Sequence, residues 1–295
     1  MCCFFKINRR CPEAKDKACS KLNLLLNYIF SILTRNLNMF FSGSRHFYDR
    51  YRLNSPKGNF VLKITEEQLI YQFSNDILKV FPEFVSLPHK FKLNFAKRIL
   101  NFLRQYEFVE KENVQLTNAH KISIAASYIK LTLGFTNYLV NTFHSILVYP
   151  TAQYFPHLNE THTGHFNPKM KVIMLALDEY ERDIYFNADG KDVALHEFTH
   201  ALCFEMLQTN AKHPNAENFK KFFQRIQQWF SIPENRFSIE KSIFLRSYAF
   251  TDRLELISVL IELFFEKEKF FKLKFPDLYL LTGNMIKHPK INSKI

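Results

Sequence analysis

Glycine and cysteine are scarce in this sequence, and both shortages narrow the range of functions. Only six of its 295 residues are glycine, which leaves little room for a glycine-rich loop that cradles phosphates. The five cysteines show no zinc-finger spacing, and four of them lie within residues 1–19. An odd count, with Cys203 alone in the rest of the chain, does not indicate a disulfide-stapled secreted domain. We therefore expect a reducing, cytoplasmic compartment.

Long uninterrupted hydrophobic runs are also missing. The best candidate, residues 22–41, carries a polar residue at every third or fourth position, namely Asn23, Asn27, Ser31, Arg35 and Asn38. A spanning helix needs about 20 apolar residues without a charge, and no small-residue cleavage site of a secretory signal is obvious. The spacing favours an amphipathic helix that lies on a membrane or on the body of the protein. A membrane anchor stays open as the alternative.

Positive charge is concentrated at the start of the chain. Residues 1–60 hold eleven Lys and Arg against three Asp and Glu, so most of the net charge of +12 lies there. Such a basic arm suits an anionic membrane surface or nucleic acid, and a solvated extension explains it equally well. The rest of the chain is nearly balanced in charge, which argues against a nucleic-acid binder.

The chain beyond this arm predicts one α+β domain in which helices dominate. Residues 53–59 mark a linker, and no internal repeat or low-complexity tract is present. Thr65 and Gln68 form a capping-box pattern at the start of the first helix. Hydrophobic periodicity predicts helices at 64–78, 89–108, 120–142, 189–207, 219–230 and 254–271, and short strands at 144–150 and 171–177 on either side of a polar loop. We expect a basic arm at 1–59 and a single domain at 60–290.

The strongest motif is His196-Glu197-Phe198-Thr199-His200. On a helix, residues four apart lie on one face, so both imidazoles can reach one metal ion. Glu197 lies beside them, close enough to accept a proton from water at the metal. The surrounding residues are apolar and predict a buried helix, where two histidines and a carboxylate are costly unless they have a partner. The motif therefore predicts a zinc metallopeptidase.

A catalytic zinc site needs a third protein ligand. Glu255 is the best candidate among the acids of the apolar segment 254–271. Glu262 lies seven residues later, two helical turns on, and so faces the same way. One of the two can bind the metal while the other hydrogen-bonds a ligand imidazole, and a partly solvated acidic stripe is the alternative. Tyr248, seven residues before Glu255, is either a donor to the oxyanion of a tetrahedral intermediate or a packing residue.

These residues resemble a known family. The segments LHEFTHAL (195–202) and SYAFTDRLELISVLIELFFEKEKFFKLKFPDLY (247–279) resemble the Mlc titration factor A family of zinc peptidases, which are similar to the catalytic domain of lethal-factor peptidases. Five residues match the family pattern in order and spacing: Tyr248, Glu255, Glu262, Phe264 and Phe265. Similar segments at 97–108, 143–150 and 163–175 extend the resemblance over about residues 80–290.

The resemblance implies a helix-dominated, zincin-like fold with a small sheet beside the active-site helix. By the same resemblance, the zinc ligands would be His196, His200 and Glu255. Glu197 would be the general base, and Tyr248 would stabilise the transition state. The edge of strand 171–177 would pair with the substrate backbone. Family members act as aminopeptidases, and the founding member binds a transcriptional repressor of sugar uptake.

Two positions depart from the family pattern. His165 stands where a carboxylate is expected just after Gly164, and Asp192 stands where an amide is expected before the active-site helix. Neither departure replaces a predicted metal ligand, so the two put the substrate preference in doubt more than the metal binding.

Other candidate groups have simpler explanations. We interpret His157, His162 and His165 as polar loop residues and Cys203 as a small buried apolar residue. The main hypothesis is a zinc-dependent peptidase that acts on a peptide or protein substrate. The alternative is a regulatory binding protein that sequesters a transcriptional repressor or another partner, or that attaches to a membrane through its arm, with a structural or residual zinc site.

Overall fold

The computed structural model describes residues 62–155, 159–185, 191–242, 245 and 247–292. All of them belong to one structural unit, Lys57–Ile295. The predicted basic arm, its helix at 22–41 and His157 lie outside the described residues. Within the part of the chain that the structure describes, no helix is long and apolar enough to cross a membrane.

The first described elements are helical: α3 (Glu66–Val80), η1 (Pro82–Ser86), α4 (His89–Gln105) and α5 (Asn118–Leu131). α3 begins at the predicted capping box, where the Thr65 backbone donates to Gln68 at 2.9 Å and the Gln68 backbone donates to Thr65 at 3.2 Å. The helices predicted at 89–108 and 120–142 are shorter than expected. The chain has left α5 by Gly134, where a Cβ atom would lie 1.9 Å from the carbonyl oxygen of Lys287. Glycine at this position therefore allows the chain after α5 to pack closely against the C-terminal segment.

A four-stranded sheet follows, with the strand order β1-β2-β6-β5. Its strands are β1 (Glu107–Glu110), β2 (Ser145–Tyr149), β5 (Gly164–Asn167) and β6 (Val172–Ala176). β1, β2 and β6 are parallel, with Ile146 opposite both Phe108 and Ile173, and β5 runs antiparallel to β6. β2 and β6 are buried along their whole length, which explains their continuous apolar sequences.

Two predictions for this region are wrong. The loop predicted between the two apolar strands contains β5 and a separate hairpin of β3 (Gln153–Phe155) and β4 (Glu160–His162). The expected free edge of strand 171–177 does not exist, because β6 has β2 on one side and β5 on the other. Among the described residues, β5 is the strand at that end of the sheet.

The remaining elements are helical. They are α6 (Leu177–Tyr185), α7 (Val193–Leu207), α8 (Ala216–Ser231), α9 (Pro233–Lys241), η2 (Ser247–Phe250), α10 (Arg253–Glu266), α11 (Glu268–Lys274), α12 (Pro276–Met285) and α13 (Pro289–Asn292). The helix predicted at 254–271 is thus two helices, because the backbone leaves the helical conformation at Lys267.

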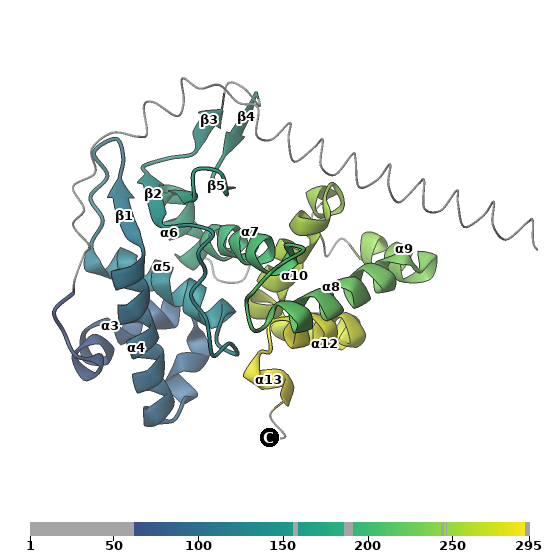
Figure 1. Ribbon diagram of the computed structural model, residues 1–295, viewed down its shortest axis with the longest axis horizontal. Helices are drawn as coiled ribbons and strands as arrows, with labels where there is room; N and C mark the ends of the chain where they lie inside the picture. Colours follow the sequence, from purple (N-terminus) through teal and green to yellow (C-terminus); the bar gives the residue numbers. More distant parts are fainter. Residues whose placement is uncertain (1–61, 156–158, 186–190, 243–244, 246, 293–295) are drawn as a thin grey trace, which may run out of the picture. The chain divides into compact units, whose positions relative to one another are not determined.

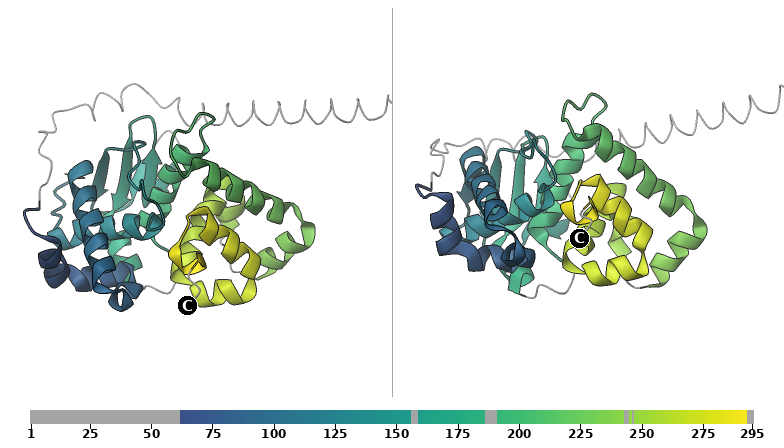
Figure 2. Two further views of the ribbon diagram at one scale, coloured as in Figure 1. Left: turned by 60° about the horizontal axis from the view of Figure 1, so that its bottom comes forward. Right: turned by 90° about the horizontal axis from the view of Figure 1, so that it is seen from below.

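α7 lies in the middle of these elements, between the N-terminal helices and the C-terminal ones (Figures 1 and 2). It packs against α5, α8 and α10 and beside strand β5. Phe198 anchors its buried side, with its ring centroid 5.1 to 5.9 Å from those of Phe102, Tyr128 and Phe143. The expected fold class is confirmed: the protein is a helix-dominated α+β domain with a small sheet beside the helix that carries the histidine motif.

Candidate metal centre

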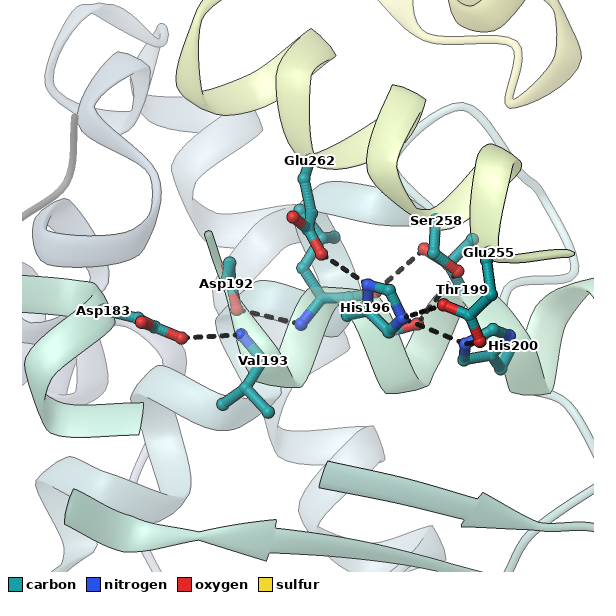
Figure 3. Close-up of polar contacts among 10 residues, drawn as sticks. Asp183, Asp192, Val193, His196, Thr199, His200, Glu255, Ser258 and Glu262 are labelled. Carbon is teal, nitrogen blue, oxygen red and sulfur yellow. Dashed lines mark hydrogen bonds and ion pairs between the residues drawn. The ribbon is translucent and has the colours of Figure 1, made fainter. Parts of the chain in front are cut away.

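The start of α7 is fixed by two carboxylates. Asp192 is the N-cap residue, and its side chain accepts a hydrogen bond of 2.8 Å from the backbone N–H of Leu195. Asp183 accepts a hydrogen bond of 2.9 Å from the backbone N–H of Val193 (Figure 3). Because the first N–H groups of a helix have no partner within the helix, these contacts stabilise α7 just before its first histidine.

Three predicted ligands converge where α7 meets α10. His196 Nε2 lies 3.1 Å from one oxygen of Glu255, and His200 Nε2 lies 3.3 Å from the other. The two Nε2 atoms are 3.0 Å apart. Figure 3 shows both imidazoles on α7 pointing toward the Glu255 carboxylate on α10. Among the described residues, this is the one group of three His, Cys, Asp or Glu side chains in which each offers a ligand atom within 4.8 Å of the others.

The spacing of these donor atoms fits a metal ion. Zinc bonds of about 2.0–2.1 Å in a tetrahedral arrangement place neighbouring ligand atoms about 3.3 Å apart. The two Nε2 atoms are 3.0 Å apart, and each lies 3.1 or 3.3 Å from a different oxygen of Glu255. Two imidazoles and one carboxylate are also a donor set that catalytic zinc sites use. The group therefore fits a divalent metal ion both in geometry and in chemistry.

Glu262 orients one of the imidazoles. His196 Nδ1 donates to Glu262 Oε1 at 2.5 Å, so in the neutral ring that a metal ion would bind, the lone pair of Nε2 is directed toward Glu255 and His200. Glu262 is nearly inaccessible, with 2% of its side chain exposed. A buried carboxylate behind a metal-binding imidazole is a recurrent arrangement, because it fixes both the tautomer and the ring orientation.

The electrostatics of the group favour a cation. Burial lowers the pKa of His196, but hydrogen bonds to Glu255 and Glu262 outweigh it and raise that pKa to about 10. Burial raises the pKa of Glu255, and hydrogen bonds with His196 and His200 outweigh it and hold that pKa well below its ordinary value. The two carboxylates thus stabilise positive charge at the point where the imidazoles meet.

Glu197 lies between α7 and the edge strand β5. Burial raises its pKa, while His200, His196 and the backbone N–H of Phe166 lower it. A Cβ atom on Gly164 would lie 2.7 Å from Glu197 Oε1, so the absence of a side chain there makes room for the carboxylate. A buried carboxylate with a raised pKa is suited to proton transfer near neutral pH.

The other residues singled out in the sequence are placed as follows. Tyr248 lies on η2, which packs against α10, but its side chain is outside what the structure describes. His162 ends β4 and His165 lies on β5, with ring centroids 5.6 Å apart. His162 Nε2 is 3.2 Å from Glu160. Cys203 is fully buried on α7, as expected of a small apolar residue.

A comparison with protein families matches residues 57–285 to the glucose-regulated metallopeptidases, family M90. The chain belongs to this family. A comparison with curated proteins gives no match. Membership of M90 makes the protein a metallopeptidase and confirms the resemblance to a zinc metallopeptidase family found in the sequence.

Sequence reasoning missed three features of this M90 centre. Strand β5, with Gly164 against Glu197, was taken for loop. Asp183 was not singled out, although it holds the start of α7. Lys130 is 1% exposed and contacts Asp192. It is the one charged residue in the mostly apolar segment 122–131, and a lone lysine in such a segment could have indicated a buried ion pair.

Proposed function

We propose that this M90 metallopeptidase is a zinc-dependent peptidase in which His196, His200 and Glu255 bind the metal. The observation that carries the proposal is the convergence of the His196 and His200 imidazoles from α7 on the Glu255 carboxylate of α10, with donor atoms close enough for one metal ion. Glu262 would hold His196 in the required tautomer. Zinc, when bound, would polarise the substrate carbonyl and lower the pKa of water.

In this proposal Glu197 is the general base. Its carboxylate accepts a proton from the attacking water and then passes that proton to the leaving amine. The raised pKa suits both steps, because a base must take up the proton and an acid must release it near neutral pH. Tyr248 would donate a hydrogen bond to the oxyanion, a role that rests on the family resemblance and on the position of η2 beside α10.

The substrate backbone would lie along β5 rather than β6. The carbonyl of Thr163 accepts a hydrogen bond of 2.8 Å from the backbone N–H of Ala176. Because backbone groups alternate in direction along a strand, those of Thr163 and of every second residue after it face β6. Those of Gly164 and Phe166 then face the outer edge of the sheet, where the Phe166 backbone also reaches Glu197. An extended peptide that adds to this edge would place its carbonyl group close to the general base.

The resemblance further supports aminopeptidase-like action on peptides in a cytoplasmic setting. Peptides with a free N-terminus would then be cleaved faster than internal bonds. The basic arm at 1–59 would carry any contact with a membrane surface or a regulatory protein, separately from the domain at 60–290.

The first test compares purified wild type with His196→Ala and Glu197→Gln, by metal analysis and by cleavage of aminoacyl and internal peptide reporters. We expect about one zinc ion per wild-type chain with chelator-sensitive cleavage. His196→Ala should lose both, and Glu197→Gln should keep zinc while kcat falls by about 10²–10⁴-fold. Full activity in Glu197→Gln would exclude the mechanism.

The same samples separate the peptidase from the regulatory binding protein. Zinc without cleavage in the wild type would favour a protein that sequesters a partner, since a structural site does not need Glu197. A wild type that binds no metal would refute the proposed ligand set.

A further inference from the structure

Lys130 is buried where α5 meets the ends of α3, α7 and α10. It lies near the end of α5, and only 1% of its side chain is exposed. Its Nζ atom donates to Asp192 at 3.0 Å, to Glu266 at 3.1 Å and to the backbone carbonyl of Val80 at 2.9 Å. All three donor positions of the ammonium group are therefore used.

The two carboxylates belong to the helices that carry the metal ligands. Asp192 is the N-cap of α7, four residues before His196, and Glu266 is the last residue of α10, four residues after Glu262. Each therefore lies one helical turn from the His196–Glu262 hydrogen bond, on the same side of it. Lys130 joins α7 to α10 at one end of the pair, and the predicted metal ligands join them at the other.

This ion cluster is better explained by register than by stability. Burying a lysine and two carboxylates is costly, and such groups commonly add little to the free energy of unfolding compared with apolar side chains. Burial lowers the pKa of Lys130, but Asp192 and Glu266 outweigh it and raise the pKa above its ordinary value, so the lysine stays charged. A charged group that needs both partners at once disfavours any sliding of α7 along α10.

We propose that Lys130, Asp192 and Glu266 form a clamp that fixes the register of α7 against α10 and so sets the spacing of His196 and His200 from Glu255. The three are positioning residues, because the metal would touch none of them. The proposal rests on the proposed zinc site, since it concerns the geometry of that site's ligands. Asp192 has two contacts: its Oδ1 atom caps α7, and its Oδ2 atom accepts a hydrogen bond from Lys130.

The test is the zinc affinity of metal-free protein, measured by competition with a chelator, for wild type, Lys130→Met and Asp192→Asn. Methionine keeps the length of the side chain without its charge, and asparagine remains a good N-cap. We expect both variants to bind zinc about 10–100-fold more weakly. Unfolding of each metal-free variant, monitored by circular dichroism, checks that the zinc affinities are those of folded protein.

The chain offers a matched control. Lys290 also holds two carboxylates, at 2.5 Å from Glu83 and 2.7 Å from Glu268, but its partners lie on η1 and α11 rather than on α7 and α10. Lys290→Met should lower the free energy of unfolding and leave the zinc affinity of the folded protein within about twofold of wild type.

The two variants change the charge in opposite directions, so their zinc affinities distinguish the clamp from a simple electrostatic effect. Removing the positive charge of Lys130 would strengthen cation binding, and removing the negative charge of Asp192 would weaken it. A clamp predicts that both weaken it. Affinities that shift in opposite directions, or that match wild type, would overturn the clamp alone. A wild type without zinc would overturn the proposed site as well. If Lys130→Met does not fold, Lys130→Gln takes its place beside Asp192→Asn, because it also removes the positive charge and the same criterion then applies.

Discussion

Helix α10 meets a buried histidine on each of two sides, and the two histidines have opposite surroundings. On the side toward α7, His196 contacts the carboxylates of Glu255 and Glu262, and its pKa is raised to about 10. On another side, His288 is 2% exposed, with ring centroids 5.2 and 5.3 Å from those of Phe264 and Phe265. Burial and the nearby Lys290 lower the pKa of His288 to about 3.

The difference shows what turns a buried histidine into a cation site. Burial alone drives an imidazole toward its neutral form, as at His288. Carboxylates placed two turns apart on a facing helix reverse that preference, as Glu255 and Glu262 do at His196. The residues of α10 that face each histidine therefore decide whether it favours a cation. Substitutions on the carboxylate side should change zinc affinity, and those on the apolar side should change the free energy of unfolding.

The largest effect is expected on the carboxylate side, from Glu255→Gln. An amide is a poor ligand for zinc and cannot offset the charge of the ion, so we expect zinc affinity to fall by on the order of 10³-fold or more, with hydrolysis falling to background. Metal content after dialysis and a reporter peptide assay would show it. Retention of one tightly bound zinc ion per chain would remove Glu255 from the ligand set.

Phe264→Ala tests the apolar side. Phe264 is fully buried and stacks on Tyr279 with ring centroids 4.9 Å apart. Truncation of such a side chain costs about 3–5 kcal/mol in the free energy of unfolding, which urea titration of the metal-free protein would measure. Zinc affinity of the folded variant should stay close to that of wild type. A tenfold loss of affinity would show that the two sides of α10 are coupled.

The carboxylate side of this comparison was largely predictable from sequence, for a physical reason. His196 and His200 are four residues apart in an apolar helical stretch, and helix geometry alone places them on one face. Glu255 and Glu262 are acids in another apolar stretch, and such residues need a partner. Local spacing and burial singled out all four, although a partly solvated acidic stripe stayed open for the two glutamates, and the family pattern assigned their roles.

Strand β5 and the clamp were not predictable in this way. Gly164–Asn167 has no alternation of apolar and polar residues, and its place at the end of the sheet depends on pairing with β6. The partners of Lys130 lie 62 and 136 residues away along the chain. Contacts of this kind follow from the packing of several helices, which no local pattern encodes.

Glu262→Gln should have a smaller effect than the first two changes. Glutamine can still accept a hydrogen bond from His196 Nδ1, but it loses the charge that favours a cation. We expect zinc affinity to fall by about 10–100-fold while the free energy of unfolding of the metal-free protein changes little, as chelator competition and urea titration would show. An unchanged affinity would mean that Glu262 has a structural role only.

The smallest effect is the acid sensitivity that His288 adds. Its pKa is about 6.5 in the unfolded chain and about 3 when folded, so the unfolded state binds the extra proton between these values. The stability contributed by neutral His288 is complete above pH 6.5 and is lost as the pH falls toward 3, by about 1.4 kcal/mol per pH unit near pH 5. Urea titrations at pH 7 and pH 5 should show a smaller loss in the free energy of unfolding for His288→Leu than for wild type, because leucine has no proton to bind.

Carboxylates elsewhere titrate equally in both proteins, so the difference between the two losses isolates the imidazole. Equal losses would mean that His288 is already protonated in the folded state, and the contrast with His196 would then rest on geometry alone.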